Sequence, residues 1–282
     1  MNNKELADLS KSIRRDVLEM ISLAGSGHPG GSLSAVDIIV SLYFTIMRHR
    51  PNDPKWPERD RFVLSKGHAA PALYAVLARA GYFPREKLFT LRKLGSILQG
   101  HPDANKCPGI DASTGPLGQG LSFANGIAMA AKADRKDYIV YVMLGDGELQ
   151  EGQVWEAAMT AGHHNLNNVV AIVDCNDLQI DGSVCDIKCI TPLADKWRAF
   201  GWNALAIDGH NHEMIVTALS QINDYDPDND PLNMYFTWGN KPTVILAHTV
   251  KGKGIKRMEH KREWHGKRIE KDVLLECLKE LE

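Results

Sequence analysis

The chain has 282 residues, enough for one large domain or two small ones. Its formal net charge of −2 at pH 7 gives no electrostatic case for binding nucleic acid or an anionic membrane, so neither is expected as a partner. The N-terminus lacks a signal-like apolar core, no apolar run approaches membrane-spanning length, and the five cysteines form no C-x-x-C pair. These features predict a cytoplasmic protein with reduced thiols.

The first pattern along the chain is the periodicity of an amphipathic helix near the N-terminus. Apolar residues from Leu6 to Ile21 recur at the spacing of an amphipathic helix that ends before Gly25. A short strand is predicted at RFVLS, residues 61–65, and a Gly- and Pro-rich loop over 95–120. The helices predicted in this part of the chain cover residues 4–24, 33–48, 69–80 and 120–134.

Apolar strands alternate with helices in the second half of the chain. The strands are predicted at 138–145, 168–174, 203–208 and 243–249, and the helices near 153–164, 191–200 and 211–221. Strands that are apolar on both faces and are separated by helices predict a mostly parallel sheet flanked by helices, a doubly wound α/β fold. We expect residues 1–282 to form a single domain.

The stretch MLGDGELQEG, residues 143–152, places an acid at the end of a buried strand. Gly145 and Gly147 let the backbone approach a ligand, and a helix beginning near Gln153 would point its positive end at the same place, which suits a diphosphate. An acid facing a diphosphate makes sense if a divalent cation lies between them. The alternative is that this Gly-Asp-Gly segment is only a turn.

The next strand ends in DCNDL, residues 174–178, and supplies further oxygen atoms. Three groups could hold Mg²⁺ together: the Asp146 carboxylate, the Asn176 side chain and the Leu178 carbonyl. The sequence therefore predicts a Mg²⁺ site that leaves room for diphosphate oxygens and water. The alternative role of Asn176 is to cap a turn.

Four histidines adjoin Gly or Pro and are therefore predicted in loops: His28, His68, His101 and His265. Each alone would be an ordinary solvent-facing residue, but four with similar flanks predict a shared polar pocket in which protons are exchanged. His163 and His164 are expected mid-helix with a structural role. The segment TGPLGQG, residues 114–120, is either a loop that meets a flat ligand or a simple helix entry.

Taken together, these motifs resemble the N-terminal, diphosphate-binding half of the transketolases, which are thiamine diphosphate enzymes. SGHPGG, LSKGHAAPALYA, GHPD, TGPLGQGLS, GDGELQEGQVWEA, the CN of DCN, IDG and KGKG…WHG occur in the family's order over residues 10–268. The 28 residues between Gly147 and Asn176 fit the family's thiamine diphosphate motif.

The resemblance implies a role for each matched residue. The metal, Mg²⁺ with Ca²⁺ or Mn²⁺ as substitutes, would be held by Asp146, Asn176 and the Leu178 carbonyl. The cofactor would meet His68, Gly115, Pro116, Leu117, Gly147, Asn176 and His265. The sugar and its transferred two-carbon unit would meet the catalytic residues His28, His101 and His265. Glu151 and Glu156 match acids buried at the family's subunit interface, whereas Glu148 is expected to be an ordinary loop residue.

Transketolases also have a pyrimidine-binding domain and a C-terminal domain, which this sequence does not contain. Those domains carry the glutamate that activates the aminopyrimidine and most sugar-phosphate contacts. We therefore expect a separate C-terminal subunit, with two copies of each chain in a two-plus-two heterotetramer.

The resemblance implies transfer of a two-carbon ketol unit from a ketose phosphate to an aldose phosphate, with the cofactor as electron sink. Two alternatives within the thiamine diphosphate enzymes are a subunit like deoxypentulose phosphate synthase and one like a 2-oxo acid dehydrogenase. A third is a non-catalytic assembly subunit that only binds cofactor.

Overall fold

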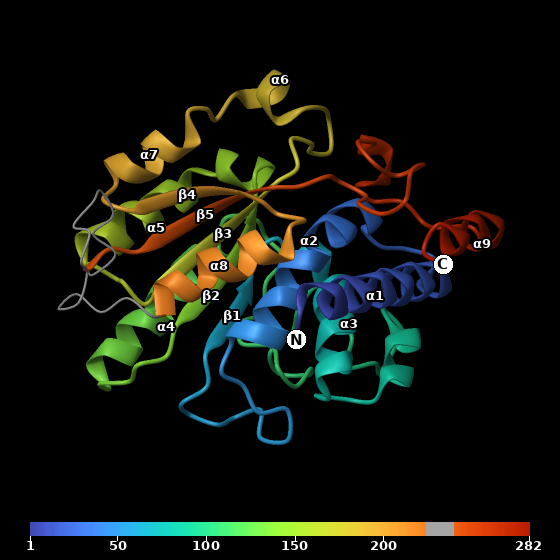
Figure 1. The fold of residues 1–282 in the computed structure, drawn as a ribbon, viewed down its shortest axis with the longest axis horizontal. Helices are drawn as coiled ribbons and strands as arrows, with labels where there is room; N and C mark the ends of the chain where they lie inside the picture. The colour runs from blue at the N-terminus through green and yellow to red at the C-terminus, as the bar shows by residue number, and fades with distance from the viewer. Residues whose placement is uncertain (224–239) are drawn as a thin grey trace.

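The computed structural model describes residues 1–223 and 240–282, whose strands form a five-stranded, fully parallel sheet in the order β1-β2-β3-β5-β4 (Figure 1). The strands are β1 (Arg61–Leu64), β2 (Val140–Gly145), β3 (Val169–Cys175), β4 (Asn203–Asp208) and β5 (Thr243–His248). The doubly wound α/β prediction is confirmed, and each predicted strand boundary lies within two residues of the observed one.

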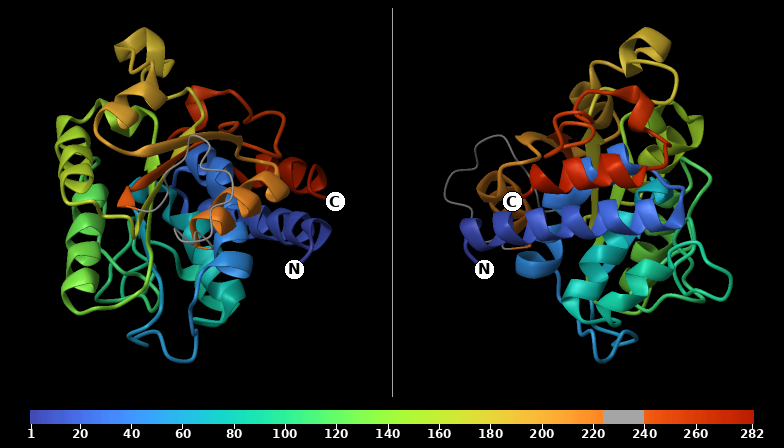
Figure 2. Two further views of the ribbon diagram at one scale, coloured as in Figure 1. Left: turned by 60° about the vertical axis from the view of Figure 1, so that its left-hand side comes forward. Right: turned by 90° about the vertical axis from the view of Figure 1, so that its right-hand side faces the viewer.

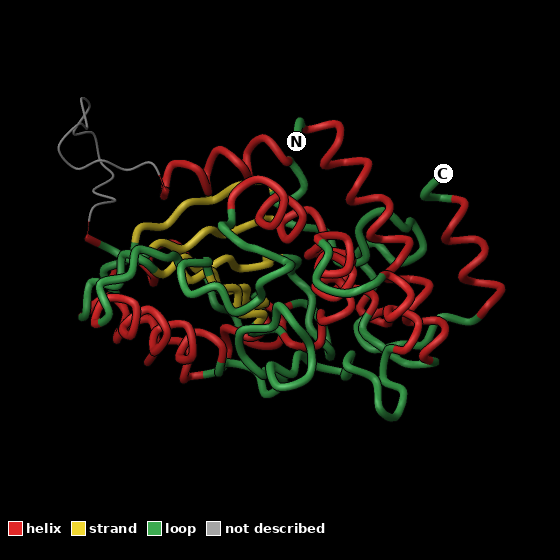
Figure 3. The backbone as a smooth tube through the Cα atoms, turned by 90° about the horizontal axis from the view of Figure 1, so that it is seen from below, coloured by secondary structure: helices red, strands yellow, loops and turns green. Residues whose placement is uncertain are grey.

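Helices cover both faces of the sheet, so the molecule has three layers (Figures 2 and 3). One face carries α1 (Asn3–Ala24), α2 (Pro29–Ser41), α3 (Ala70–Ala80), α8 (His212–Asn223) and α9 (Lys271–Lys279). The other carries α4 (Gly120–Ala133), α5 (Gly152–His163) and α7 (Leu193–Ala199). The short α6 (Val184–Lys188) lies beyond one edge of the sheet in Figure 1.

The strands are apolar throughout because both of their faces are buried. In β3 every residue is buried, with Val170 and Ile172 in one hydrophobic core and Val169, Ala171 and Val173 in the other. This alternation follows from the two-residue period of a strand. A strand between two cores exposes its polar groups only where it ends, so chemistry is confined to the sheet edge.

Helix α2 departs from the prediction, because it begins at Pro29 instead of residue 33 and continues into a π-helix, Leu42–Ile46. Proline suits a first helical turn, and Gly30 is needed there because a Cβ would lie 2.9 Å from the Trp264 carbonyl oxygen. The combined stretch 29–46 is long and apolar enough to cross a membrane by length and composition, contrary to our expectation, but 83% of it is buried inside the fold.

Three smaller differences concern helix positions. His163 is the last residue of α5 and His164 follows it, so this exposed pair does not lie mid-helix as expected. Helices α6 and α9 were not anticipated from the sequence. The register of the central strands places Gly145 opposite Asp174, so the segments after β2 and β3 leave the sheet together.

Candidate active site

A cavity of about 250 Å³ lies at the carboxyl edge of the sheet, where β2 and β3 end. Residues from seven separate segments line it, among them Gly31, Lys66, His68, Asp146, Asn176 and Lys251. This is the edge at which open α/β sheets bind ligands.

Asp146 and Asn176 meet at this cavity, as the sequence predicts. The two Asp146 carboxylate oxygens accept hydrogen bonds from the backbone N–H groups of Gly147, at 2.8 Å, and Asp177, at 2.5 Å. Burial, and then the charge of Asp174, raise the pKa of Asp146 to about 7. A carboxylate in such surroundings gains from a nearby cation.

Leu178 also lines the cavity and follows Asp177, which has a positive φ of 62°. The Lys251 ammonium donates to the Leu178 carbonyl at 2.8 Å and lies 2.9 Å from His265 Nδ1. Burial, followed by the charge of Lys66, lowers the pKa of Lys251 to about 8. A carbonyl oxygen has two lone pairs, so this bond leaves one free for a second partner.

The donor set fits a hard divalent cation and a diphosphate. A carboxylate, an amide oxygen and a carbonyl are ligands that Mg²⁺ accepts, and no group of three His, Cys, Asp or Glu within residues 1–223 and 240–282 offers an alternative metal site. Lys66 and Lys251, both buried, supply positive charge for phosphate oxygens. Gly147 allows the backbone to pass close to Gln179 in the cavity wall, because a Cβ on residue 147 would lie only 3.0 Å from the Gln179 Cβ.

The cavity rests on a buried ion pair that the sequence analysis missed. Lys66 pairs with Asp174 at the end of β3 and also donates to the Gly31 carbonyl at 3.0 Å. Ser34 donates to the same carboxylate at 2.6 Å, and Asn176 at 3.2 Å. Burial alone would raise the pKa of Asp174, but the Lys66 ammonium holds it below its usual value. The pair therefore orients Asn176 and ties β3 to α2.

The four histidines predicted in loops come together beside the cavity, although His68 lies in a short 3-10 helix, Gly67–Ala69. Ring centroids are 5.3 Å apart for His28 and His68, 5.0 Å for His68 and His265, and 5.7 Å for His28 and His265. His101 lies 6.4 Å from His28. The buried Nδ1 of His28 has no hydrogen-bond partner in the part of the chain that the structure describes. The cluster thus offers polar atoms to a bound molecule.

The surroundings favour the neutral form of all four histidines. Burial, and then Arg92, lower the pKa of His28 to about 4, and burial with Lys251 lowers that of His265 to about 3. Burial lowers the pKa of His68 well below its usual value, and burial with Arg92 also lowers that of His101. Neutral imidazole can both donate and accept a hydrogen bond, as proton exchange between hydroxyl groups requires.

The TGPLGQG loop reaches the site through two of its three predicted residues. Leu117 lines the cavity, and a Cβ on Gly115 would lie 3.5 Å from the His101 ring. Pro116 is exposed and does not line the cavity. Thr114 fixes the loop by donating to the Leu64 carbonyl at 2.7 Å.

Glu148 corrects a prediction, because it is not an ordinary loop residue. It is only 3% exposed, and its carboxylate accepts hydrogen bonds from Ser65 Oγ at 2.5 Å, Gly118 N at 2.8 Å and Gly145 N at 3.0 Å. It therefore joins the ends of β1 and β2 to the TGPLGQG loop. By contrast, Glu151 and Glu156 are exposed in this chain, Glu151 at the rim of the cavity.

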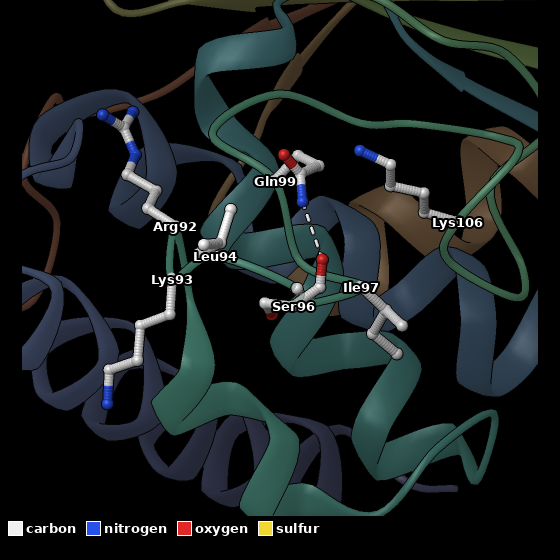
Figure 4. Close-up of a pocket in the computed structure, with 8 residues that line it drawn as sticks. Arg92, Lys93, Leu94, Ser96, Ile97, Gln99 and Lys106 are labelled. Carbon is white, nitrogen blue, oxygen red and sulfur yellow. Dashed lines mark hydrogen bonds between the residues drawn. The ribbon is translucent and has the colours of Figure 1, made fainter.

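A second cavity of about 580 Å³ is formed by the segment from Arg92 to Lys106 and carries basic side chains (Figure 4). Arg92, Lys93 and Lys106 line it, and Gln99 donates to the Ser96 carbonyl at 2.7 Å. Arg92 faces away from Lys93 and its charge acts on two histidines of the cluster. None of these residues belongs to a motif that predicts a function from the sequence.

The family model "Transketolase, thiamine diphosphate binding domain" matches residues 6–281. The chain is 45% identical to the 6-deoxy-6-sulfo-D-fructose transketolase subunit SqwG of Clostridium sp. (strain MSTE9), over 99% of this chain and 96% of that one. It is 43% identical to an apulose-4-phosphate transketolase subunit of Phocaeicola vulgatus, over 91% of this chain and 86% of that one.

Solved structures show the same relationship. The transketolase of Campylobacter jejuni superposes with a TM-score of 0.90 at 34% identity. The match covers 100% of this chain but 43% of that one. The chain therefore spans the length of the subunit relatives and less than half of a single-chain relative.

Proposed function

Because this chain belongs to the transketolase family, through its thiamine diphosphate-binding domain, we propose that it is the cofactor-binding subunit of a two-chain transketolase. It moves a two-carbon ketol unit from a ketose to an aldose. The observation that carries this proposal is the cluster of four histidines beside a cavity that suits a metal and a diphosphate.

In this proposal a partner chain contributes the other part of the active site. Support comes from the two relatives named as subunits, whose lengths this chain nearly spans. The partner carries the pyrimidine-binding and C-terminal domains, and two copies of each chain make a heterotetramer. Cysteine usage supports assembly in the cytoplasm.

Bound thiamine diphosphate supplies an electron sink for the two-carbon unit. Asp146, Asn176 and the Leu178 carbonyl hold Mg²⁺, which Ca²⁺ or Mn²⁺ can replace. The residues that bind the diphosphate are His68, Gly147, Asn176 and His265. Lys66 and Lys251 add positive charge beside it. Leu117, with Gly115 behind it, would flank the rings of the cofactor, whereas the exposed Pro116 would not reach them from this chain.

The substrate side of the site is formed by His28, His101 and His265. Each can hold a substrate hydroxyl and move its proton, because its surroundings favour the neutral imidazole. Two relatives are named for sugars with a terminal sulfonate or phosphate. The basic side chains of Arg92, Lys93 and Lys106 support a ketose donor that likewise carries an anionic end.

The decisive experiment mixes the purified chain with its partner subunit, Mg²⁺ and thiamine diphosphate, and measures ketol transfer from ketose phosphates and ketose sulfonates. We expect turnover only with both subunits present. Asp146→Ala should weaken Mg²⁺-dependent cofactor binding at least ~100-fold by calorimetry. Asp134→Ala, an exposed acid at the end of α4, is the matched control and should bind normally.

Two results would count against this proposal. Robust turnover by the isolated chain would overturn the two-subunit arrangement. Unchanged cofactor affinity in Asp146→Ala would overturn the metal site.

A further inference from the structure

Two of the five cysteines lie side by side on an exposed segment outside the site described above. Cys185 belongs to α6 and Cys189 follows its last residue, and their sulfur atoms are 2.6 Å apart. Both side chains are exposed, whereas Cys107, Cys175 and Cys277 are buried. Two unbonded sulfur atoms rarely approach so closely, and a disulfide bond needs only about 2.05 Å.

The local sequence makes this approach possible. Ser183 caps the helix by accepting a hydrogen bond from Asp186 N at 3.1 Å, which fixes the first turn. Residues four apart on a helix lie on one face with their Cα atoms about 6 Å apart, within the range that disulfides span. Cys189 directly follows the last helical residue, and its sulfur already lies 2.6 Å from that of Cys185, so only a small movement of the two side chains separates them from bonding distance.

The surroundings of the two thiols shift their pKa values in opposite directions. Hydrogen bonds from Cys185 and from Thr191, 3.1 Å away, lower the pKa of the Cys189 thiol to about 7. The same contact with Cys189 raises the pKa of Cys185. A substantial fraction of Cys189 is thus thiolate at neutral pH, the form that attacks a disulfide.

We propose that Cys185 and Cys189 are a redox-active dithiol that low-molecular-weight disulfides convert reversibly to an intramolecular disulfide. Cys189 attacks the external disulfide, forming a mixed disulfide and releasing one thiolate. Cys185 then loses its proton to water and attacks Cys189 Sγ, which expels the second thiolate. Two protein thiols are oxidised and one external disulfide is reduced to two thiols, so atoms and electrons balance.

The position of the pair connects it to the cavity. Segment 178–189 begins with Leu178, Gln179 and Ile180, which line the cavity. The Gln150 side chain, also a lining group, donates to the Lys188 carbonyl at 2.9 Å and the Val184 carbonyl at 3.2 Å. The disulfide would therefore brace the last turn of α6 at the point where the cavity wall holds it.

The test uses the intact, reduced chain incubated with oxidised glutathione at pH 7 and then trapped with N-ethylmaleimide. We expect peptide mass spectrometry to find a disulfide between residues 185 and 189, and thiol counting to find two thiols lost. Reduced glutathione should restore both. Amide hydrogen exchange in residues 184–189 should be slower in the oxidised chain.

Single variants separate the two roles. Cys185→Ser should stop at a stable glutathione adduct on Cys189, because no second thiol can resolve it. Cys189→Ser should react at least ~5-fold more slowly, since it lacks the low-pKa thiol. Cys107→Ser, a change at a buried cysteine, should behave like the unmodified chain. A chain that stays reduced, or that accumulates adducts without the internal disulfide, overturns the proposal.

Discussion

Glu148 shows how a single buried carboxylate can hold the site together. Its two oxygens accept three hydrogen bonds, and two of their donors are backbone N–H groups of glycines in separate segments. A buried N–H group that loses its acceptor costs about 1–3 kcal/mol. The geometry of the cavity wall therefore depends on a residue that needs no contact with the cofactor.

We predict that Glu148→Ala lowers the free energy of unfolding by about 3–5 kcal/mol, because the N–H groups of Gly118 and Gly145 are left buried without partners. Glu148→Gln should have a smaller effect, since one acceptor oxygen remains. Urea denaturation measures both. The control is Glu151→Ala, an exposed change three residues away, which should stay within about 0.5 kcal/mol of the unmodified chain. Equal effects at the two positions would contradict this role.

At the scale of single residues, the sequence predicts those residues whose role follows from their immediate sequence neighbours. Asp146 and Asn176 follow buried strands that pair in parallel, so their meeting could be inferred before the structure was known. Glu148 could not be identified in this way, because its partner Ser65 lies 83 residues away in the chain. The ion pair of Lys66 and Asp174 could not be predicted for the same reason, because the two residues are 108 positions apart in the chain. A buried charge is recognisable only when its partner is known.

At the level of elements, a polar network fixes the segment that carries Lys251. Arg14 of α1 binds both oxygens of Asp37 of α2, and His210 Nδ1 lies 2.7 Å from the same carboxylate. His210 Nε2 accepts a hydrogen bond from Val250 N at 2.8 Å, so the ring proton lies on Nδ1 and is donated to Asp37. Three elements thus determine where the residue after Val250 enters the cavity.

His210→Ala should lower the free energy of unfolding by about 1–3 kcal/mol and weaken cofactor affinity severalfold, because the Val250 N–H loses its acceptor and Lys251 is no longer held in place. Denaturation and calorimetry with Mg²⁺ and thiamine diphosphate measure the two effects. His248→Ala, an exposed histidine at the end of β5, is the control and should change neither. If His210→Ala is less stable but binds cofactor normally, the network does not position Lys251.

Prediction of elements succeeds where one local pattern dominates. The central strands are uniformly apolar between helices, and this pattern identifies them. Prediction places the start of α2 four residues too late, because two glycines weaken the helical signal where close packing against Trp264 requires a small residue. It fails at α6, a five-residue helix that is set by the Ser183 cap and the bond from Gln150 to its end, not by an apolar face.

At the scale of the whole molecule, the two faces of the sheet differ in what they leave uncovered. Helices α4 and α5 lie side by side, joined by a hydrogen bond from Asn125 to the Ala157 carbonyl at 2.8 Å (Figure 2). Their outer surface exposes Phe123 and Met159, at 47% and 54%, beside the exposed Glu156. Large apolar side chains that remain exposed on outer helices are candidates for a contact between subunits.

We therefore predict that Met159→Glu abolishes ketol transfer by preventing assembly with the partner chain, while the circular dichroism spectrum of the isolated protein is unchanged. A carboxylate forced into an apolar interface loses its hydration without gaining a partner, which costs several kcal/mol. Light scattering of the mixed subunits reports the assembly. Met214→Glu is the matched control, since Met214 is 42% exposed on α8, on the opposite face of the sheet. If Met159→Glu assembles as well as Met214→Glu, the α4–α5 surface is not the contact between subunits.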